Sequence, residues 1–201
     1  MNFVNDQEQN ESLNGGHFAE KLQRLDGMLG EVFVKIDELG ISDNTVVVLM
    51  ADNGNMHVYP SYASGFNDLI YRGGKTDHLE GGVRVDAFVR WNGVIEPGSH
   101  AGDIFHVSDL FTTFARLGQA TQHIPTDRVI DGIDQTALLL KGEHHGRRDY
   151  VYIYQNDILR SVVKQEYKMH LPAPGMPAAG AGVYNLLRDP REEKPYVGMS
   201  L

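Results

Sequence analysis

The sequence predicts an α/β fold, in which an incomplete layer of sheet and helices is followed by a small antiparallel C-terminal subdomain. Three observations support this prediction. Apolar residues recur at helical spacing over residues 17–39, an unbroken apolar run fills residues 45–50, and short aromatic or β-branched segments alternate with polar turns after residue 142. We therefore expect residues 1–16 to be a polar, disordered lead, 17–142 to form the α/β part and 143–201 to form the antiparallel subdomain.

The α/β part begins with an amphipathic helix over residues 17–39, which Gly40 closes as a C-terminal cap. A turn over residues 42–44 leads into a strand over residues 45–50. This strand is apolar and mostly β-branched throughout, which is typical of a strand buried on both faces of a parallel sheet. We therefore place it in the middle of the sheet.

The rest of the α/β part contains a long loop, a strand and a second helix. Residues 55–80 are irregular and rich in Gly, Tyr, Asn and Ser, and a loop of this length is usually functional. Residues 83–91 alternate as a strand. The second helix spans residues 108–117. Ser108 is placed to cap its N-terminus, the negative charge of Asp109 interacts favourably with the helix dipole, and Gly118 ends the helix.

The C-terminal subdomain is predicted to be a four-stranded antiparallel sheet. Its strands are short and separated by polar residues of the kind found in turns. The predicted strands cover residues 150–154, 159–163, 167–171 and 183–186, and the Pro, Ala and Gly residues of 171–182 form a loop between the last two.

The composition excludes several classes of function. The 201 residues include 18 Lys and Arg against 27 Asp and Glu, and the net charge of −9 argues against a surface for nucleic acid or anionic membrane. No apolar run approaches the roughly 18 residues of a membrane-spanning helix. The absence of cysteine rules out disulfides, thiolate metal sites and a cysteine nucleophile. The first residues lack the layout of a secretory signal.

The first candidate site is Asp52-Asn53, which follows the buried strand directly. Ligands of open α/β sheets bind beyond the carboxyl ends of the strands. A carboxylate and an amide carbonyl are hard oxygen donors that suit calcium or magnesium. The alternative is a tight turn, because Asp-Asn-Gly is also a favoured hairpin connection.

The second candidate site is the glycine-flanked Lys75, in Arg72-Gly73-Gly74-Lys75, which is followed by Glu80-Gly81-Gly82. The glycines let the backbone approach a ligand closely, and the lysine supplies a compact positive charge for an anion. The spacing is not that of a phosphate-binding P-loop. The alternative is a solvated, flexible loop with surface charges.

Several motifs together resemble the C-terminal part of a sulfatase, in the alkaline-phosphatase-like superfamily. The segment HFAEKLQRLDGMLGEVFVKIDELGISDNTVVVLMADNG is similar to the helix, strand and metal-binding Asp-Asn-Gly of that family. YRGGKTDHLEGGVRVDAFVRWNGVIEPGS resembles its Gly-Gly-Lys loop and the Glu-Gly-Gly-x-Arg segment that follows. HVSDLFTTFARLG resembles the next helix, while LRSVVKQEYKMHL and VYNLLRDPREE look like the closing antiparallel subdomain.

The resemblance implies roles for individual residues. Asp52 and Asn53 would be two ligands of a divalent cation, usually Ca²⁺, and Lys75 would contact the sulfate oxygens and steady the leaving oxygen. His78 lies where the family varies and is a weaker candidate for a substrate contact, while Arg72 and Glu80 would be loop scaffolding. The implied activity is that of an arylsulfatase-like sulfuric ester hydrolase, periplasmic or secreted as complete members of the family are.

The family's nucleophile has no counterpart in these residues. Sulfatases use a formylglycine made from Cys or Ser in a [CS]-x-P-S-R motif, and this motif is absent, as are counterparts of the N-terminal metal aspartates. We therefore expect the chain alone to be inactive and to associate with itself or with a complementary N-terminal piece. Two alternatives remain open: part of a related phosphodiesterase or phosphonate hydrolase, and a non-catalytic remnant that acts through a partner.

Overall fold

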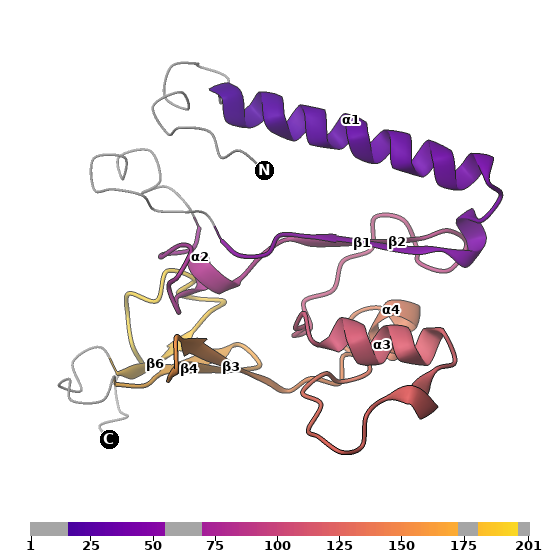
Figure 1. Cartoon of the computed structure of the whole chain (residues 1–201). Helices are drawn as coiled ribbons and strands as arrows, with labels where there is room; N and C mark the ends of the chain where they lie inside the picture. The colour runs from indigo at the N-terminus through magenta and orange to yellow at the C-terminus, as the bar shows by residue number, and fades with distance from the viewer. Residues whose placement is uncertain (1–15, 55–69, 173–180, 197–201) are drawn as a thin grey trace.

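The chain is mixed α/β with two antiparallel sheets (Figure 1). The computed structural model describes residues 16–54, 70–172 and 181–196. The predictions of a disordered lead over residues 1–16 and of a loop over 171–182 fall largely outside the described residues. The helices are α1 (Gly16–Glu38), the 3₁₀ turn η2 (Ser42–Asn44), α2 (Glu80–Val83), α3 (Asp109–Leu117), η4 (Thr121–His123) and α4 (Thr136–Lys141). The strands are β1 (Val46–Met50), β2 (Ala87–Trp91), β3 (Tyr150–Gln155), β4 (Ile158–Lys164), β5 (Tyr167–His170) and β6 (Gly182–Asn185).

Helix α1 ends as the sequence predicts, at a left-handed glycine. Gly40 has φ +66°. Its amide donates to Asp37 O at 3.0 Å, and the amide of Ile41 donates to Ile36 O at 3.3 Å. These two bonds form a Schellman motif, which satisfies carbonyls that the last turn leaves free. The predicted helix and its cap are confirmed.

Strand β1 pairs with β2 in an antiparallel ribbon, with a register that runs from Val46 opposite Trp91 to Met50 opposite Ala87. The prediction that this strand is buried on both faces of a parallel sheet is wrong for the structure of this chain. Its residues are half-buried and Leu49 is exposed, because β2 is its one partner among the described strands and the opposite edge is open.

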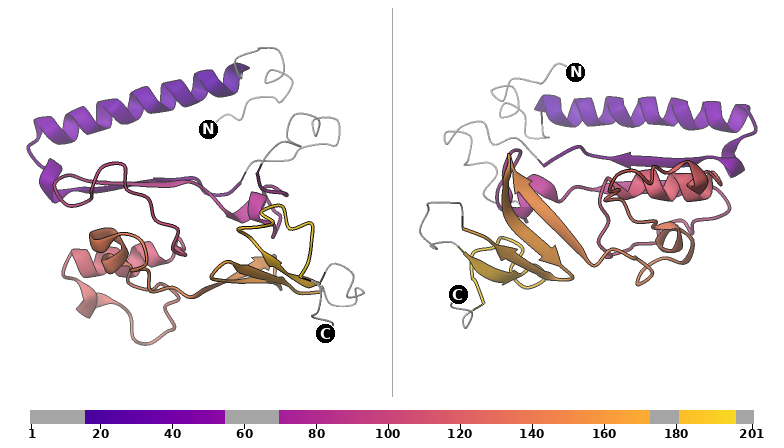
Figure 2. Two further views of the ribbon diagram at one scale, coloured as in Figure 1. Left: turned by 180° about the vertical axis from the view of Figure 1, so that it is seen from behind. Right: turned by 60° about the horizontal axis from the view of Figure 1, so that its bottom comes forward.

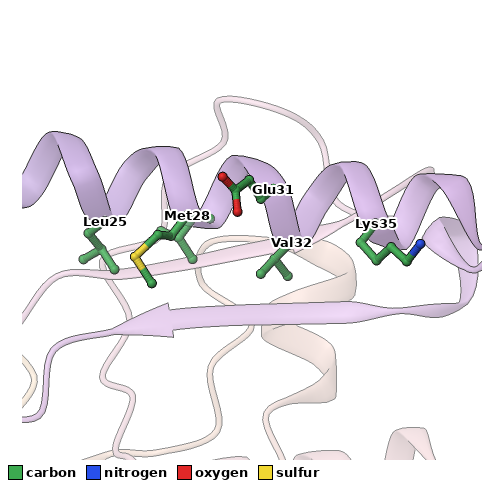
Figure 3. Close-up of a pocket in the computed structure, with 6 residues that line it drawn as sticks. Leu25, Met28, Glu31, Val32 and Lys35 are labelled. Atoms are coloured by element: carbon green, nitrogen blue, oxygen red, sulfur yellow. The ribbon is translucent and has the colours of Figure 1, made fainter.

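Helix α1 runs alongside the β1–β2 ribbon in every view (Figures 1 and 2). Figure 3 shows that the side chains of Leu25, Met28 and Val32 point from the helix toward the ribbon. They nevertheless line an open groove of about 410 Å³ and remain 39%, 56% and 50% exposed. The apolar side of α1, which we define as Leu25, Met28, Leu29 and Val32, is therefore only partly covered.

The strand predicted over residues 83–91 begins later, at Ala87, and Glu80–Val83 forms the short helix α2 instead. The reason is the glycine pair at its centre. A Cβ on Gly81 would lie 2.3 Å from Gly73 O, and one on Gly82 would lie 2.4 Å from Gly74 O. Only residues without a side chain allow this helical turn to pack on the preceding loop.

Helix α3 covers Asp109–Leu117 and ends at Gly118 as predicted, but Ser108 makes no capping hydrogen bond. The Ser108 hydroxyl instead contacts His106 Nδ1 at 2.7 Å. Asp109 does more than favour the helix dipole, because it is fully buried and accepts hydrogen bonds from the amides of His106 and Ile133. Its carboxylate also forms an ion pair with Arg148, whose Nε lies 2.8 Å from Oδ2. Asp109 thus ties α3 to the chain that enters β3.

The C-terminal subdomain is confirmed as a four-stranded antiparallel sheet of order β3-β4-β5-β6. All four strands fall within two residues of the predicted bounds. Two-residue turns join β3 to β4 and β4 to β5, and each starts with a residue of left-handed conformation, Asn156 and Gln165, both at φ +53°.

The interior of the described residues is mostly polar. The fully buried side chains are Lys168, Gln135, Glu192, Thr113, Asp109 and Ser161, whereas the buried apolar residues are Leu138, Ile153, Tyr184 and Leu186. No described helix combines the length and the apolar character that crossing a bilayer requires.

We predict that the isolated chain self-associates through the apolar side of α1 and the open edge of β1, since uncovered apolar faces and strand edges favour association. Light scattering and binding of a hydrophobic dye measure this. The double variant L25K/V32K should reduce both signals, whereas Arg24→Ala on the same helix should not. A monodisperse monomer that binds no dye and unfolds cooperatively would contradict the prediction.

We also predict that Asp109 stabilises the fold in a pH-dependent way. Burial raises the pKa of Asp109. The hydrogen bonds from Arg148, Ile133 and His106 lower it by more, so the pKa lies below its ordinary value. Its contribution to the free energy of unfolding is therefore fully present above about pH 3.9, the pKa of Asp in the unfolded chain. The contribution is lost as the pH falls through the lower pKa that Asp109 has in the folded chain. Asp109→Asn should lower the free energy of unfolding by about 3 kcal/mol at pH 7, because it leaves Arg148 unpaired.

Urea unfolding at pH 7 and at pH 3 measures this difference, which should shrink at the lower pH. Asp127→Asn is the control, because its ion pair with Arg128 lies on the surface and its removal should change little. Equal losses of stability at both pH values for Asp109→Asn would refute the assigned role.

Candidate functional site

The first part of the candidate site is the chain segment that leaves β1. Asp52 is exposed, and Asn53 is half-buried with its amide nitrogen donating to Gly54 O at 2.8 Å. The amide oxygen of Asn53 and the carboxylate of Asp52 are therefore the two oxygen donors that this segment offers. The amide of Gly54 donates to Gly82 O at 3.0 Å, so the segment ends on α2.

The second part is the loop between Arg72 and Glu80, which carries Lys75 and His78. The loop is closed at its base, because the amide of Gly81 donates to Arg72 O at 2.8 Å. Within it, the amide of Asp77 donates to Gly74 O at 2.9 Å, and Gly73 adopts φ +85°. Lys75 is half-buried.

His78 faces the interior rather than open solvent. Its Nδ1 lies 3.3 Å from Asp77 Oδ1, and its side chain is 13% exposed. The imidazole meets the ring of His170 edge-on, with 5.1 Å between the centroids. The structure thus connects His78 to the C-terminal subdomain.

Helix α2 contacts both parts of the site. A Cβ on Gly54 would lie 1.7 Å from Gly81 O, and Cβ atoms on Gly81 and Gly82 would lie 2.3 and 2.4 Å from carbonyl oxygens of the Lys75 loop. Three glycines therefore let the end of β1, α2 and the loop meet backbone to backbone. The Asp-Asn-Gly and Glu-Gly-Gly motifs of the sequence are two halves of this contact.

Glu80, at the start of α2, enters a buried ion cluster with Lys168 of β5 and Glu192. Lys168 Nζ lies 3.0 Å from Glu80 Oε1 and 3.3 Å from Glu192 Oε2. Arg84 Nε contacts Glu80 Oε2 at 2.6 Å, and His170 Nε2 contacts Glu192 Oε2. Apart from Arg84, these side chains are at least nine-tenths buried, so each charge depends on its partners in the cluster.

The cluster sets the charge state of Glu192. Burial raises the pKa of Glu192, but the hydrogen bond from His170 and the charge of Lys168 lower it more, so that the pKa lies below its ordinary value. The hydrogen bond from the amide of Glu80, at 2.7 Å, lowers the pKa as well, so the carboxylate stays ionised at neutral pH.

Sequence reasoning assigned Arg72 and Glu80 to loop scaffolding but missed their partners Lys168, His170 and Glu192. A signal is present in the sequence. Lys168 and His170 occupy alternate positions of a strand, which places both on one face, and a face with two basic residues needs acidic partners if it is buried. The sequence gives no means of locating those partners 88 and 24 residues away.

Asp52 and Asn53 are the candidate metal ligands that the sequence indicates, and they lie together at the end of β1. No group of three His, Asp or Glu side chains in residues 16–54, 70–172 and 181–196 is arranged to hold a metal ion. Asp52 and Asn53 supply two hard oxygen donors, and a Ca²⁺ ion takes about six to eight.

Comparison with known proteins identifies the family to which these motifs belong. Residues 2–120, more than half of the chain, match the family described as Sulfatase. The steryl-sulfatase of Rattus norvegicus is 38% identical over 164 residues, which cover 80% of this chain and 28% of that protein. The N-acetylgalactosamine-6-sulfatase of Mus musculus is 33% identical over 156 residues, covering 78% of this chain and 29% of that protein. The chain thus spans less than a third of the length of these relatives.

The fold leads to the same family. The PsFucS1 sulfatase from a Pseudoalteromonas species superposes with a TM-score of 0.76 at 26% identity, over 96% of this chain and 41% of that one. The α/β fold expected from the resemblance is therefore confirmed, with the chain corresponding to a part of the complete fold. This protein belongs to the sulfatase family, whose named relatives hydrolyse sulfuric esters.

Proposed function

We propose that this chain carries part of the cation and sulfate site of an arylsulfatase-like hydrolase. The observation that supports this most strongly is the contact of α2 with both the Asp52-Asn53 segment and the Lys75 loop. Residues of two motifs, 22 positions apart along the chain, are held on one short helix. A solvated loop with unrelated surface charges would not need three close glycine contacts.

Asp52 and Asn53 are proposed as two ligands of a divalent cation, with Ca²⁺ as the best fit. Both offer hard oxygen atoms, and the amide nitrogen of Asn53 is already bonded to Gly54 O. A bound Ca²⁺ would offset negative charge on sulfate oxygens. The remaining ligands would come from water in the isolated chain, or from a further polypeptide segment in a complete site.

Lys75 is proposed to contact the sulfate oxygens. Its ammonium group is a compact charge that suits an anion, and the glycines on its N-terminal side pack on α2 and so hold the backbone that carries it. When the ester bond breaks, the same charge would steady the leaving oxygen. His78 has a lesser part, because its ring packs toward His170 and Asp77. The substrate would be the sulfate ester of an alcohol or a phenol.

The nucleophile would come from elsewhere, because no [CS]-x-P-S-R motif occurs in the 201 residues. The apolar side of α1 and the open edge of β1 favour a complementary N-terminal piece of the family fold as the partner that supplies it. Such a piece would add strands to the sheet and cover α1. Self-association is the competing use of the same surfaces.

We predict that the isolated chain does not hydrolyse a nitrophenyl sulfate with any divalent cation, because the nucleophile is missing. Release of nitrophenol is followed by absorbance, with Lys75→Ala as the matched control. Turnover that survives repurification and disappears in Lys75→Ala would show instead that the chain is catalytically complete.

We predict weak calcium binding, with a dissociation constant of about 1 mM or higher, because two protein ligands leave most of the coordination shell to water. Calorimetry measures the affinity. Asp52→Ala should abolish the binding, whereas Asp86→Ala, which removes a nearby exposed carboxylate, should retain it. A micromolar affinity that depends on Asp52 would mean that further ligands of this chain complete the site.

A further inference from the structure

We infer that Glu192, in the turn after β6, is the positioning residue that fixes both ends of the loop carrying Lys75 and His78. This inference deepens the proposed function and rests on it for the meaning of the loop. It adds a role for a residue that lies 117 positions after Lys75 in the chain.

Two different atoms of Glu192 hold the two ends of the loop. Its backbone carbonyl accepts a hydrogen bond from Arg72 Nη2 at 2.7 Å, at the start of the loop. Its carboxylate Oε1 accepts one from the amide of Glu80 at 2.7 Å, at the end of the loop. Together with the bond from the Gly81 amide to Arg72 O, these contacts fix the distance between the ends.

Glu192 is itself held rigidly. Its amide donates to Asp189 O at 3.0 Å, and the residue is 1% exposed. His170 Nε2 contacts its Oε2, and Lys168 Nζ lies 3.3 Å from Oε2 and 3.4 Å from Oε1, so both oxygens are held on the side of the sheet while Oε1 also accepts from the loop. The strand that carries Lys168 and His170 lies inside the four-stranded sheet, between β4 and β6. The carboxylate of Glu192 thus fixes the position of the loop relative to the sheet.

Other residues of the sheet hold the middle of the loop more weakly. Gln155 Nε2 donates to Thr76 O at 2.9 Å, and the Ser161 hydroxyl lies 3.5 Å from His78 O. Neither residue reaches the ends of the loop. Glu192 differs from both in contacting the two flanks at once.

The chemistry favours positioning over bulk stability. A buried ion cluster contributes little net stability, because removing charges from water costs about as much as their attraction returns. A carboxylate with two oxygens, however, has defined acceptor directions, and an apolar contact has none. A flexible lysine side chain needs a fixed backbone if its charge is to meet a sulfate at a set place.

Hydrogen–deuterium exchange of the full chain, followed by mass spectrometry, tests this role. Glu192→Ala should raise the exchange rate of residues 73–79 at least about tenfold, because the loop loses a charge-assisted hydrogen bond at one end. Glu193→Ala is the matched control, since the neighbouring carboxylate is exposed and pairs with Arg191. It should leave the loop unchanged.

Two further variants separate positioning from general stability. Glu192→Gln keeps an oxygen acceptor for the Glu80 amide, so it should restore most of the protection. Arg72→Met removes the contact with the Glu192 carbonyl at the start of the loop and leaves all the charged side chains of the ion cluster in place, so it tests the role even if Glu192→Ala does not fold. Unchanged exchange of residues 73–79 in Arg72→Met and Glu192→Ala would overturn the inference, and so would an equal rise in β3 and β4.

A titration with inorganic sulfate, followed by calorimetry, keeps the two proposals distinguishable. Sulfate binding that is lost in Lys75→Ala and weakened about tenfold in Glu192→Ala, but unchanged in Glu193→Ala, supports both. If the unaltered chain binds no sulfate, the proposed sulfate contact of Lys75 fails. The exchange rates still decide whether Glu192 positions the loop.

Discussion

The buried ion cluster of Glu80, Lys168 and Glu192 is the interaction on which the rest of the structure depends. It joins the short helix α2 to the C-terminal sheet across 88 residues of sequence. Removing one partner leaves an uncompensated buried charge, which costs about 3–5 kcal/mol, so the three side chains are retained or lost as a unit. The end of β1 and the Lys75 loop both pack on α2, and therefore both depend on this cluster.

Close glycine contacts and buried charges have different roles in the candidate site. Gly54, Gly81 and Gly82 remove the side chains that would keep three backbone segments apart. The ion cluster then fixes where the packed segments lie relative to the sheet. In the resulting candidate site the polar parts are fixed to the C-terminal sheet, while the apolar side of α1 is only partly covered by the β1–β2 ribbon.

The sequence predicts the local elements well, because helix periodicity, glycine caps and short β-branched runs are local signals. The Schellman end of α1 at Gly40 and the four strands of the C-terminal sheet follow from them. The burial of β1 could not be predicted, since it depends on which strands lie beside it. The true partner of Asp109 and the role of Glu192 also required the structure, because Arg148 and Glu80 are 39 and 112 residues away.

The central claim is that the end of β1 and the Lys75 loop form parts of one site in this member of the sulfatase family. Paramagnetic broadening of backbone amide resonances, with Mn²⁺ added in place of Ca²⁺, tests it most directly. The account predicts that the amides of residues 73–79 broaden and that the effect disappears in Asp52→Ala. Broadening that depends on Asp52 but leaves residues 73–79 sharp would contradict it.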